Sequence, residues 1–376
     1  MSSLARDNLE RRVRGLFDGS GVAINGPQPW DIQVGDDRFY ARVLADGSLG
    51  FGDSYVDGWW NCERIDELAA RLLRADIPSK LRPSVVLIKD ALLARLVNRQ
   101  NKSRVFRNAQ AHYDIGNDLY RAMLDRRLTY SCGYWKTAAS LDEAQEAKLD
   151  LVCRKIGLVA GQSVLDIGCG WGSFAKYAAE KYGARVVGVT VSEEQLKLGR
   201  ELCRGLPVEL RLQDYRDIKG TFDHVVSIGM AEHVGYKNYR AFFEVARRCL
   251  VDDGLFLLHT IGENTTARTT DPWIGRYIFP NSMLPSAKQL AESSEGLLVM
   301  EDWHNFGSDY DTTLMAWHRN FEAGWDGLAA RYDERFRRMW RYYLLVCAGS
   351  FRSRSNQLWQ IVYSKRGLPG GYASIR

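Results

Sequence analysis

The chain has 376 residues, of which 45% are hydrophobic and 26% charged, and its formal net charge is +5. This composition is typical of a globular protein with one large and one smaller domain, or with two domains of medium size. No apolar run approaches the ~20 residues of a transmembrane helix, and the N-terminal sequence lacks the apolar core of a secretory signal. The seven cysteines include no CxxC pair. This favours reduced thiols over a disulfide framework or a zinc site, so we expect a cytoplasmic protein without a metal.

Residues 1–105 are expected to form a small mixed domain. Residues 39–45 alternate loosely between apolar and polar and precede Asp46-Gly47, a turn sequence, which favours a strand. The apolar residues between 65 and 73 recur at helical spacing and predict a helix.

Positive charge is concentrated in residues 80–107. This segment has eight basic residues and one acid, Asp90, and thus a net charge of +7 (8 − 1), which leaves −2 (5 − 7) for the rest of the chain. The basic residues are Lys80, Arg82, Lys89, Arg95, Arg99, Lys102, Arg104 and Arg107. Apolar residues lie between them, and this mixture suits an anionic membrane surface. We therefore expect residues 1–105 to associate peripherally with the inner face of the membrane; a solvated helix face and a nucleic-acid patch are the alternatives.

From about residue 160 short buried strands alternate with helical segments. Five segments are expected to be strands: 163–167, 185–190, 208–213, 222–228 and 254–261. This alternation predicts a doubly wound parallel sheet, a Rossmann-like α/β fold, within residues 106–376. Two candidate closing strands, 298–303 and 358–363, and two helices, at about 310–325 and 329–348, are expected after it.

A glycine-rich loop follows the first of these strands. It reads Asp166-Ile-Gly168-Cys169-Gly170-Trp-Gly172, whereas a dinucleotide fingerprint would have its third glycine at Ser173. The second strand ends in Thr190 without the acid that binds a ribose in nicotinamide enzymes. Both features favour a loop of the methyltransferase type. Gln213, Asp214 and Tyr215 follow the third strand, where an adenine edge would lie, although helix capping and core packing would also explain the last two.

Several longer motifs resemble the bacterial cyclopropane-fatty-acyl-phospholipid synthases and, more distantly, the mycolic acid cyclopropane synthases. These motifs are HYDIGNDLY (112–120), LTYSCGYW (128–135), VLDIGCGWG (164–172), GVTVSEEQ (188–195), LQDYRD (212–217), GMAEHVG (229–235), LHTIG (258–262), DPWIGRYIFPN (271–281), MEDWHNFGSDYDTTLMAW (300–317) and YYLLVCAGSFR (342–352). The resemblance is strong over residues 105–365. It implies a class I methyltransferase fold with helical insertions, S-adenosylmethionine as cofactor, unsaturated phospholipid acyl chains as substrate, and a homodimer.

The resemblance also implies a set of site residues. The residues expected to bind the cofactor are Tyr130, Ser131, Asp166, Gly168, Cys169, Gly170, Gly172, Thr190, Gln195, Gln213, Asp214 and Tyr215. If an alkene attacks the sulfonium methyl group, ring closure requires removal of a proton from that methyl in an apolar site without water. The family positions that match a bound bicarbonate, the implied proton acceptor, are Cys132, Glu232, His259, Tyr310 and the backbone of Ile261.

An anion beside Glu232 is repulsive unless a proton is shared. We therefore expect Glu232 to hold bicarbonate through its O–H, while His259 and Tyr310 donate hydrogen bonds. Cys347 is expected to line the pocket. The alternatives are a core histidine at 259, a surface turn at Tyr310, and inert buried thiols at Cys132 and Cys347.

Three other functions remain open at the level of the sequence. A lipid methyltransferase would use the same chemistry but give methyl-branched or methylene products. A membrane-associated scaffold would retain the fold without activity. A methyltransferase of small soluble molecules is disfavoured by the basic segment. Nothing in the sequence indicates nucleic-acid binding as the main function.

Overall fold

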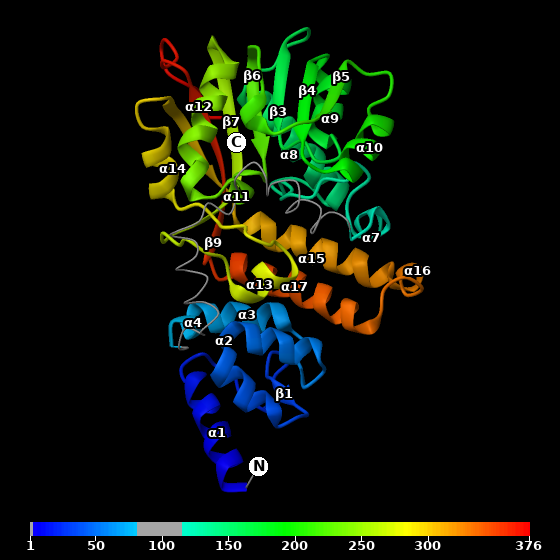
Figure 1. Cartoon of the computed structure of the whole chain (residues 1–376), viewed down its shortest axis with the longest axis vertical. Helices are drawn as coiled ribbons and strands as arrows, with labels where there is room; N and C mark the ends of the chain where they lie inside the picture. The colour runs from blue at the N-terminus through cyan, green and yellow to red at the C-terminus, as the bar shows by residue number, and fades with distance from the viewer. Residues whose placement is uncertain (1–2, 81–114) are drawn as a thin grey trace. The chain divides into compact units, whose positions relative to one another are not determined.

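The computed structural model describes residues 3–80 and 115–376, without the side chains of residues 3–5 and 80. The chain forms two compact units (Figure 1). The described residues of the first unit are those up to 80, 269–280 and 310–356; the second unit contains 115–268, 281–309 and 357–376. Two late segments of the chain thus pack with the N-terminal helices. The predicted division of function at residue 105 stays a prediction.

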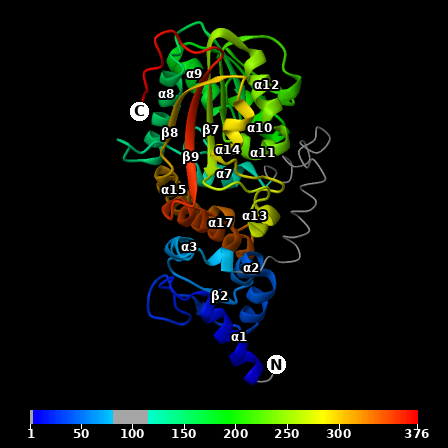
Figure 2. The same ribbon diagram turned by 90° about the vertical axis from the view of Figure 1, so that its left-hand side faces the viewer.

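The second unit is built on a seven-stranded sheet with the order β5-β4-β3-β6-β7-β9-β8. Its strands are β3 (Ser163–Ile167), β4 (Arg185–Thr190), β5 (Val208–Leu212), β6 (Phe222–Ile228), β7 (Leu250–Glu263), β8 (Val299–Asn305) and β9 (Asn356–Ser364). The pairs β3–β4, β3–β6, β4–β5 and β6–β7 are parallel, and β8 runs antiparallel to β9. Figure 2 shows β7, β9 and β8 side by side. The five predicted strands, the two closing strands and the α/β fold class are confirmed.

Helices cover both faces of this sheet. They are α7 (Asn117–Met123), α8 (Leu141–Lys155), α9 (Ser173–Tyr182), α10 (Glu193–Leu202), α11 (Ala231–Val234), α12 (Tyr239–Cys249) and α14 (Ala287–Ser294), with short 3-10 turns at η1 (Tyr215–Asp217) and η2 (Tyr236–Asn238). One core cluster packs α12 and α14 on one face of the sheet, and a second packs α8, α9 and α10 on the other. Neighbouring strand residues such as Val225 and Val226 belong to different clusters, because successive side chains of a strand point to opposite faces.

The first unit is mainly helical. Its elements are α1 (Ser3–Leu16), β1 (Gln33–Val34), α2 (Arg38–Val56), β2 (Trp60–Asn61), α3 (Ile65–Arg74), α4 (Ile77–Lys80), α13 (Pro272–Tyr277), α15 (Ser308–Ala323, part of this unit from residue 310), α16 (Trp325–Leu328) and α17 (Glu334–Arg352). The helix predicted around 65–73 is confirmed as α3. The second late helix begins at residue 334 rather than 329, where the Asp333 carboxylate accepts from the Phe336 N–H.

The strand predicted at 39–45 is wrong, because these residues belong to α2. Phe39, Tyr40 and Val43 are all buried, and their spacing fits one helix face better than the loose alternation that favoured a strand. The Asp46-Gly47 turn is a kink inside this helix, with Gly47 at a φ of 58°, a conformation that glycine adopts readily.

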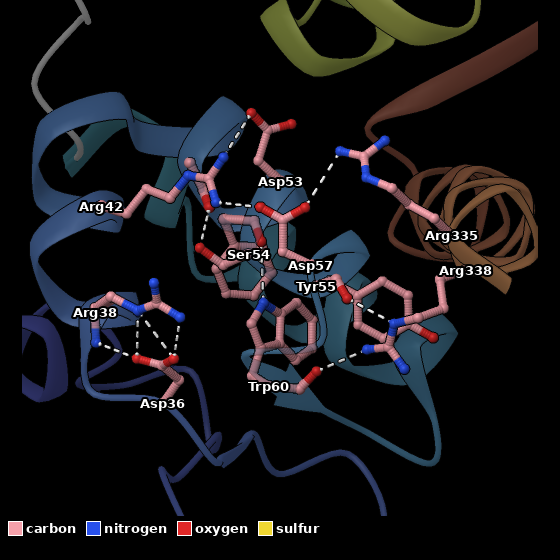
Figure 3. Close-up of polar contacts among 12 residues, drawn as sticks. Asp36, Arg38, Arg42, Asp53, Ser54, Tyr55, Asp57, Trp60, Arg335 and Arg338 are labelled. Carbon is pink, nitrogen blue, oxygen red and sulfur yellow. Dashed lines mark hydrogen bonds and ion pairs between the residues drawn. The ribbon is translucent and has the colours of Figure 1, made fainter.

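Polar contacts tie α17 to the N-terminal helices within the first unit (Figure 3). The Asp57 carboxylate accepts from Arg42 at 2.7 Å and from Arg335 at 3.2 Å. Arg338 donates to the carbonyl oxygens of Tyr55 at 2.8 Å and Trp60 at 3.0 Å. The Arg338 bonds are partly buried, whereas the two ion pairs of Asp57 are exposed. Since exposed ion pairs contribute little to stability, we expect the Arg338 bonds to matter more for the packing of α17.

In the part of the chain that is described, no helix is both long enough and apolar enough to span a bilayer. The basic segment 80–107, on which the expected membrane contact depends, lies outside the described side chains.

Candidate active site

The glycine loop connects β3 to α9 and has the backbone of a ligand-binding turn. Gly168 and Gly170 have φ values of 86° and 55°, where a side chain is strained. The N–H groups of Gly168 and Cys169 donate to the Val189 carbonyl at 3.0 Å each, which fixes the loop to β4. A Cβ at Gly170 would meet only the Gln195 amide, at 4.0 Å. The loop therefore leaves space beside Gly170 and Gln195.

The predicted cofactor residues at the ends of β4 and β5 lie together. Thr190 Oγ1 donates to Gln195 Oε1 at 3.0 Å, and the Gln213 N–H donates to the Thr190 carbonyl at 2.9 Å. Gln195 itself is oriented by Ser192, whose hydroxyl accepts the Gln195 N–H and caps α10. Because the carboxyl ends of parallel strands meet at one edge of the sheet, these polar groups adjoin the glycine loop.

Asp214 and Tyr215 have structural contacts of their own. Asp214 caps the η1 turn by accepting from the Arg216 N–H at 2.9 Å, and it forms an ion pair with the Arg216 guanidinium. The Tyr215 ring is buried in the core cluster of the α12 face, with its centroid 5.6 Å from that of Phe242. The capping and packing foreseen as the alternative are thus present, and a cofactor contact of these two residues stays a prediction.

The Asp166 carboxyl at the end of β3 is buried, and its Oδ2 has no hydrogen-bond partner among the described residues. Burial raises the pKa of Asp166 to about 7, while the Lys148 ammonium opposes this shift. A buried polar atom without a partner is costly in a folded protein. Asp166 lies two residues before Gly168, at the start of the glycine loop, where this oxygen can accept a hydrogen bond from a ligand.

Tyr130, Ser131 and Cys132 lie in a loop that α8 holds in place. The Tyr130 ring is 5.1 Å from that of Tyr120. Ser131 and Cys132 are buried, the Ser131 hydroxyl accepts from Lys148 Nζ at 2.8 Å, and Cys132 Sγ lies 3.1 Å from the Gly133 carbonyl. The predicted cofactor residue Ser131 and the predicted anion-binding residue Cys132 therefore lie next to each other in a buried loop that Lys148 contacts.

Glu232 follows β6 in the short helix α11 and is joined to Ile261 in β7. Its Oε1 accepts from the Ile261 N–H at 2.7 Å, while its buried Oε2 has no hydrogen-bond partner among the described residues. Burial raises the pKa of Glu232 to about 7, opposed chiefly by the hydrogen bond from the Ile261 N–H. Near neutral pH this carboxyl can therefore exist with or without its proton. A direct contact of Ile261 with an anion stays a prediction.

His259 lies on β7 and is fixed by Gln360 of β9. Gln360 Nε2 lies 3.3 Å from His259 Nδ1; with this amide NH₂ as the donor, Nδ1 accepts and the imidazole proton is on Nε2. The buried Nε2 has no partner among the described residues. Burial and the ammonium groups of Lys148 and Lys155 hold the pKa of His259 well below its usual value. His259 is thus a neutral imidazole with a free N–H.

Two of the predicted residues belong to the first unit. Tyr310 on α15 is buried with its ring 4.5 Å from Phe351 and 5.9 Å from Trp317, so a surface turn is excluded. Cys347 on α17 is partly buried, and burial raises the pKa of its thiol to about 12. A thiol with this pKa is not a nucleophile at neutral pH. The part of both residues in the site stays a prediction.

Sequence reasoning missed Gln145, Lys148 and Gln360, all of which are fully buried. Gln145 and Lys148 lie three positions apart on the buried face of α8, between Ala144 and Val152. A polar residue within an apolar stripe was the sequence feature that would have found them. Gln360 likewise interrupts the apolar strand 358–363.

Comparison with known proteins adds to this geometry. The family described as mycolic acid cyclopropane synthetase matches residues 100–361. The chain is 52% identical to a cyclopropane-fatty-acyl-phospholipid synthase of Escherichia coli, with 100% of this chain and 98% of that protein covered. It is 32% identical to the tuberculostearic acid methyltransferase of Mycobacterium tuberculosis, over 94% of this chain and 87% of that protein.

A solved structure has a similar fold. The crystal structure of a mycolic acid cyclopropane synthase complexed with SAH and CTAB is 34% identical, with a TM-score of 0.65, and covers 69% of this chain and 98% of that chain.

Proposed function

Because the chain belongs to the mycolic acid cyclopropane synthetase family, we propose that it is an S-adenosylmethionine-dependent enzyme that adds a methylene bridge to cis double bonds of phospholipid acyl chains. Identity of 52% over the full length to a synthase with this substrate supports it. The observation of this structure that carries the proposal is a pair of buried atoms, Glu232 Oε2 and His259 Nε2, that have no partner among residues 3–80 and 115–376. Both lie at the carboxyl edge of a sheet of the class I methyltransferase type.

The residues around the glycine loop fit S-adenosylmethionine. Space lies beside Gly170, and the Asp166 carboxyl at the end of β3 has a buried oxygen without a partner in the described part of the chain. Thr190, Gln195 and Ser131 offer further polar groups. When bound, S-adenosylmethionine supplies an electrophilic methyl group, which a weak nucleophile such as an alkene requires.

The site then needs a group that removes one proton from the added methyl. We assign this to a bicarbonate ion held by Glu232 and His259. A protonated Glu232 donates from its carboxyl O–H, and the neutral His259 donates from Nε2, so both favour an anion between them. Cys132 lines this site in the proposal, and the part of Tyr310 stays a prediction.

Burial also protects the reaction. Cys132, Glu232 and His259 are each at most 6% exposed, and exclusion of water prevents capture of a carbocation. A carboxyl whose pKa is about 7 exchanges protons readily near neutral pH, which is the condition for efficient general acid–base chemistry.

A second candidate is methylation without ring closure. The 32% identity with the tuberculostearic acid methyltransferase favours it, because the same site would transfer the methyl group and differ only in the fate of the proton.

The test is expression in a bacterium that lacks cyclopropane lipids, followed by fatty-acid analysis. Ring formation and methylene insertion both add one CH₂, so nuclear magnetic resonance of the ring protons must distinguish them. Ring protons support the proposal. Methyl-branched or methylene products establish the second candidate, and unchanged lipids with a folded, S-adenosylmethionine-binding protein overturn both.

A further inference from the structure

Lys148 is a buried cation to which neither the family comparison nor the proposed reaction gives a role. It lies in the middle of α8 with 0% of its surface exposed. Its ammonium has three N–H groups, and within the described chain one of them has a partner, Ser131 Oγ at 2.8 Å. A buried charge with so few bonds is costly unless other groups compensate it.

Gln145 acts on the same loop from one turn earlier in α8. Its amide nitrogen donates to the Ser131 carbonyl at 2.7 Å and to the Thr129 carbonyl at 3.3 Å. The loop is supported from its other side by Asp125, whose carboxylate accepts from the Thr129 N–H at 2.7 Å. Together, Gln145 and Lys148 hold both the backbone and the side chain of Ser131.

The charge of Lys148 acts on Asp166 before the glycine loop and on residues of the predicted anion site. Electrostatic interactions connect it with Asp125, Cys132 and Asp166, and they oppose the effect of burial, which lowers the pKa of Lys148 to about 8. The same ammonium lowers the pKa of His259. Lys148 thus lies near enough to influence the residue before the glycine loop and two residues of the predicted anion site.

We propose that Lys148 is a positioning residue of the active site, which holds residues 129–132 through Ser131 and supplies the buried positive charge that balances an anion there. This rests on the proposed function. A compensating charge is needed because an anion added beside Glu232 brings negative charge into a region of low polarity, and His259 is neutral. The Lys148 ammonium supplies the compensating charge without titrating in the chemical step.

The pH dependence of turnover is the first test. The Glu232 carboxyl, with a pKa of about 7, and the Lys148 ammonium, with a pKa of about 8, both lose a proton as pH rises, so turnover of the wild-type enzyme should fall in two steps. Lys148→Arg keeps the charge to far higher pH and should move the second step, the alkaline limb near pH 8, upward by at least about one unit. Lys148→Met should lower turnover on the order of 100-fold, as misplaced catalytic groups do, and should keep only the step that Glu232 contributes.

Lys155→Met is the matched control. Lys155 lies two turns later on α8, is also fully buried and also lowers the pKa of His259, but it contacts His304 at 3.0 Å rather than the loop. It therefore separates the charge effect on His259 from the contact with Ser131. This variant likewise removes a buried ammonium from α8, yet it should keep the alkaline limb near pH 8.

The outcomes separate the two proposals. A wild-type enzyme that forms no cyclopropane lipid contradicts the proposed function. An active wild-type enzyme without an alkaline limb near pH 8, or with the same limb in Lys148→Arg, overturns the role of Lys148. If Lys148→Met does not fold, the pH profiles of the wild-type enzyme and of Lys148→Arg still test the role of Lys148. Near-full turnover of a folded Lys148→Met also overturns it.

Discussion

At the scale of single residues, burial has shifted the pKa values of the groups that the reaction would use. Glu232 and Asp166 both have pKa values of about 7, and His259 is held neutral. Desolvation is the first cause in each case, which places the groups that exchange protons near neutral pH.

Glu232→Gln should reduce turnover on the order of 100-fold with little loss of S-adenosylmethionine affinity. The amide oxygen still accepts the Ile261 N–H, but the titratable proton is gone. Glu263→Gln is the matched control, since Glu263 lies at the end of β7 and its pKa is also raised to about 7 by burial; it should keep its turnover.

A bicarbonate requirement should appear when the ion is held less tightly. In carbonate-free buffer, Cys132→Ser and His259→Ala should recover turnover on graded addition of bicarbonate. Near-full activity of Glu232→Gln, together with variants that do not respond to bicarbonate, would mean that another group removes the proton, and Tyr310 would be the next candidate.

The same carboxyl should make stability depend on pH. Its folded-state pKa of about 7 lies above the usual 4.5, so between these values the folded protein binds more protons than the unfolded chain. The contribution of Glu232 to the free energy of unfolding therefore falls as pH rises through this window, by on the order of 3 kcal/mol at most. The melting temperature of Glu232→Gln minus that of the wild type should rise between about pH 5 and pH 8; a constant difference contradicts the shift.

Gly170→Val should abolish S-adenosylmethionine binding in calorimetry. The valine side chain would fill the space between the loop and Gln195 and would strain a backbone at a φ of 55°. Gly205→Val is the control for strain, because Gly205 also has a positive φ, of 82°, with no atom within 4 Å of its Cβ position. Undiminished S-adenosylmethionine affinity in a folded Gly170→Val variant would contradict the assignment of the glycine loop as the cofactor site.

At the scale of elements, glycine allows α17 to pack closely on α3. A Cβ at Gly349 would lie 2.5 Å from the Asp66 carbonyl oxygen and 2.6 Å from Ala69 Cβ. Since these are backbone and adjacent core atoms, neither can move aside without shifting a helix.

Gly349→Ala should therefore destabilise the protein by about 1–3 kcal/mol in denaturant unfolding, despite the better helix propensity of alanine. Gly327→Ala in α16 is the control, because no atom lies within 4 Å of its Cβ position, and it should be neutral or slightly stabilising. Equal stability of the two variants would show that α17 and α3 do not pack this closely.

At the scale of the whole molecule, the positive charge concentrated in residues 80–107 predicts that the protein binds anionic membrane surfaces. Replacing Lys89, Arg95 and Arg99 with glutamine should weaken sedimentation with anionic vesicles by about 1 kcal/mol per charge at most, and binding should decrease with salt.

A triple variant of Lys181, Lys197 and Lys219, exposed lysines of the second unit, loses the same charge and should sediment as the wild type does. If both triple variants bind equally, the basic segment has another purpose.

The sequence by itself determined the strands, their order along the chain and the glycine loop. These features depend on local patterns: short apolar runs followed by glycines that permit positive φ, with polar residues at the strand ends. The family resemblance placed Glu232 and His259 at one anion site, and the structure shows that β6 and β7, near whose ends they lie, pair in parallel.

Only the tertiary structure decided features that depend on contacts between distant residues. Gln360 orients His259 from 101 positions away, and Lys148 became part of the site because α8 packs against the 129–132 loop. The segment 39–45 became a helix because Phe39, Tyr40 and Val43 are buried together. Residues 310–356 joined the N-terminal unit because α17 packs on α3 through Gly349. Local sequence patterns carry no information on such partners, since burial and pKa are properties of the surroundings that the folded chain assembles.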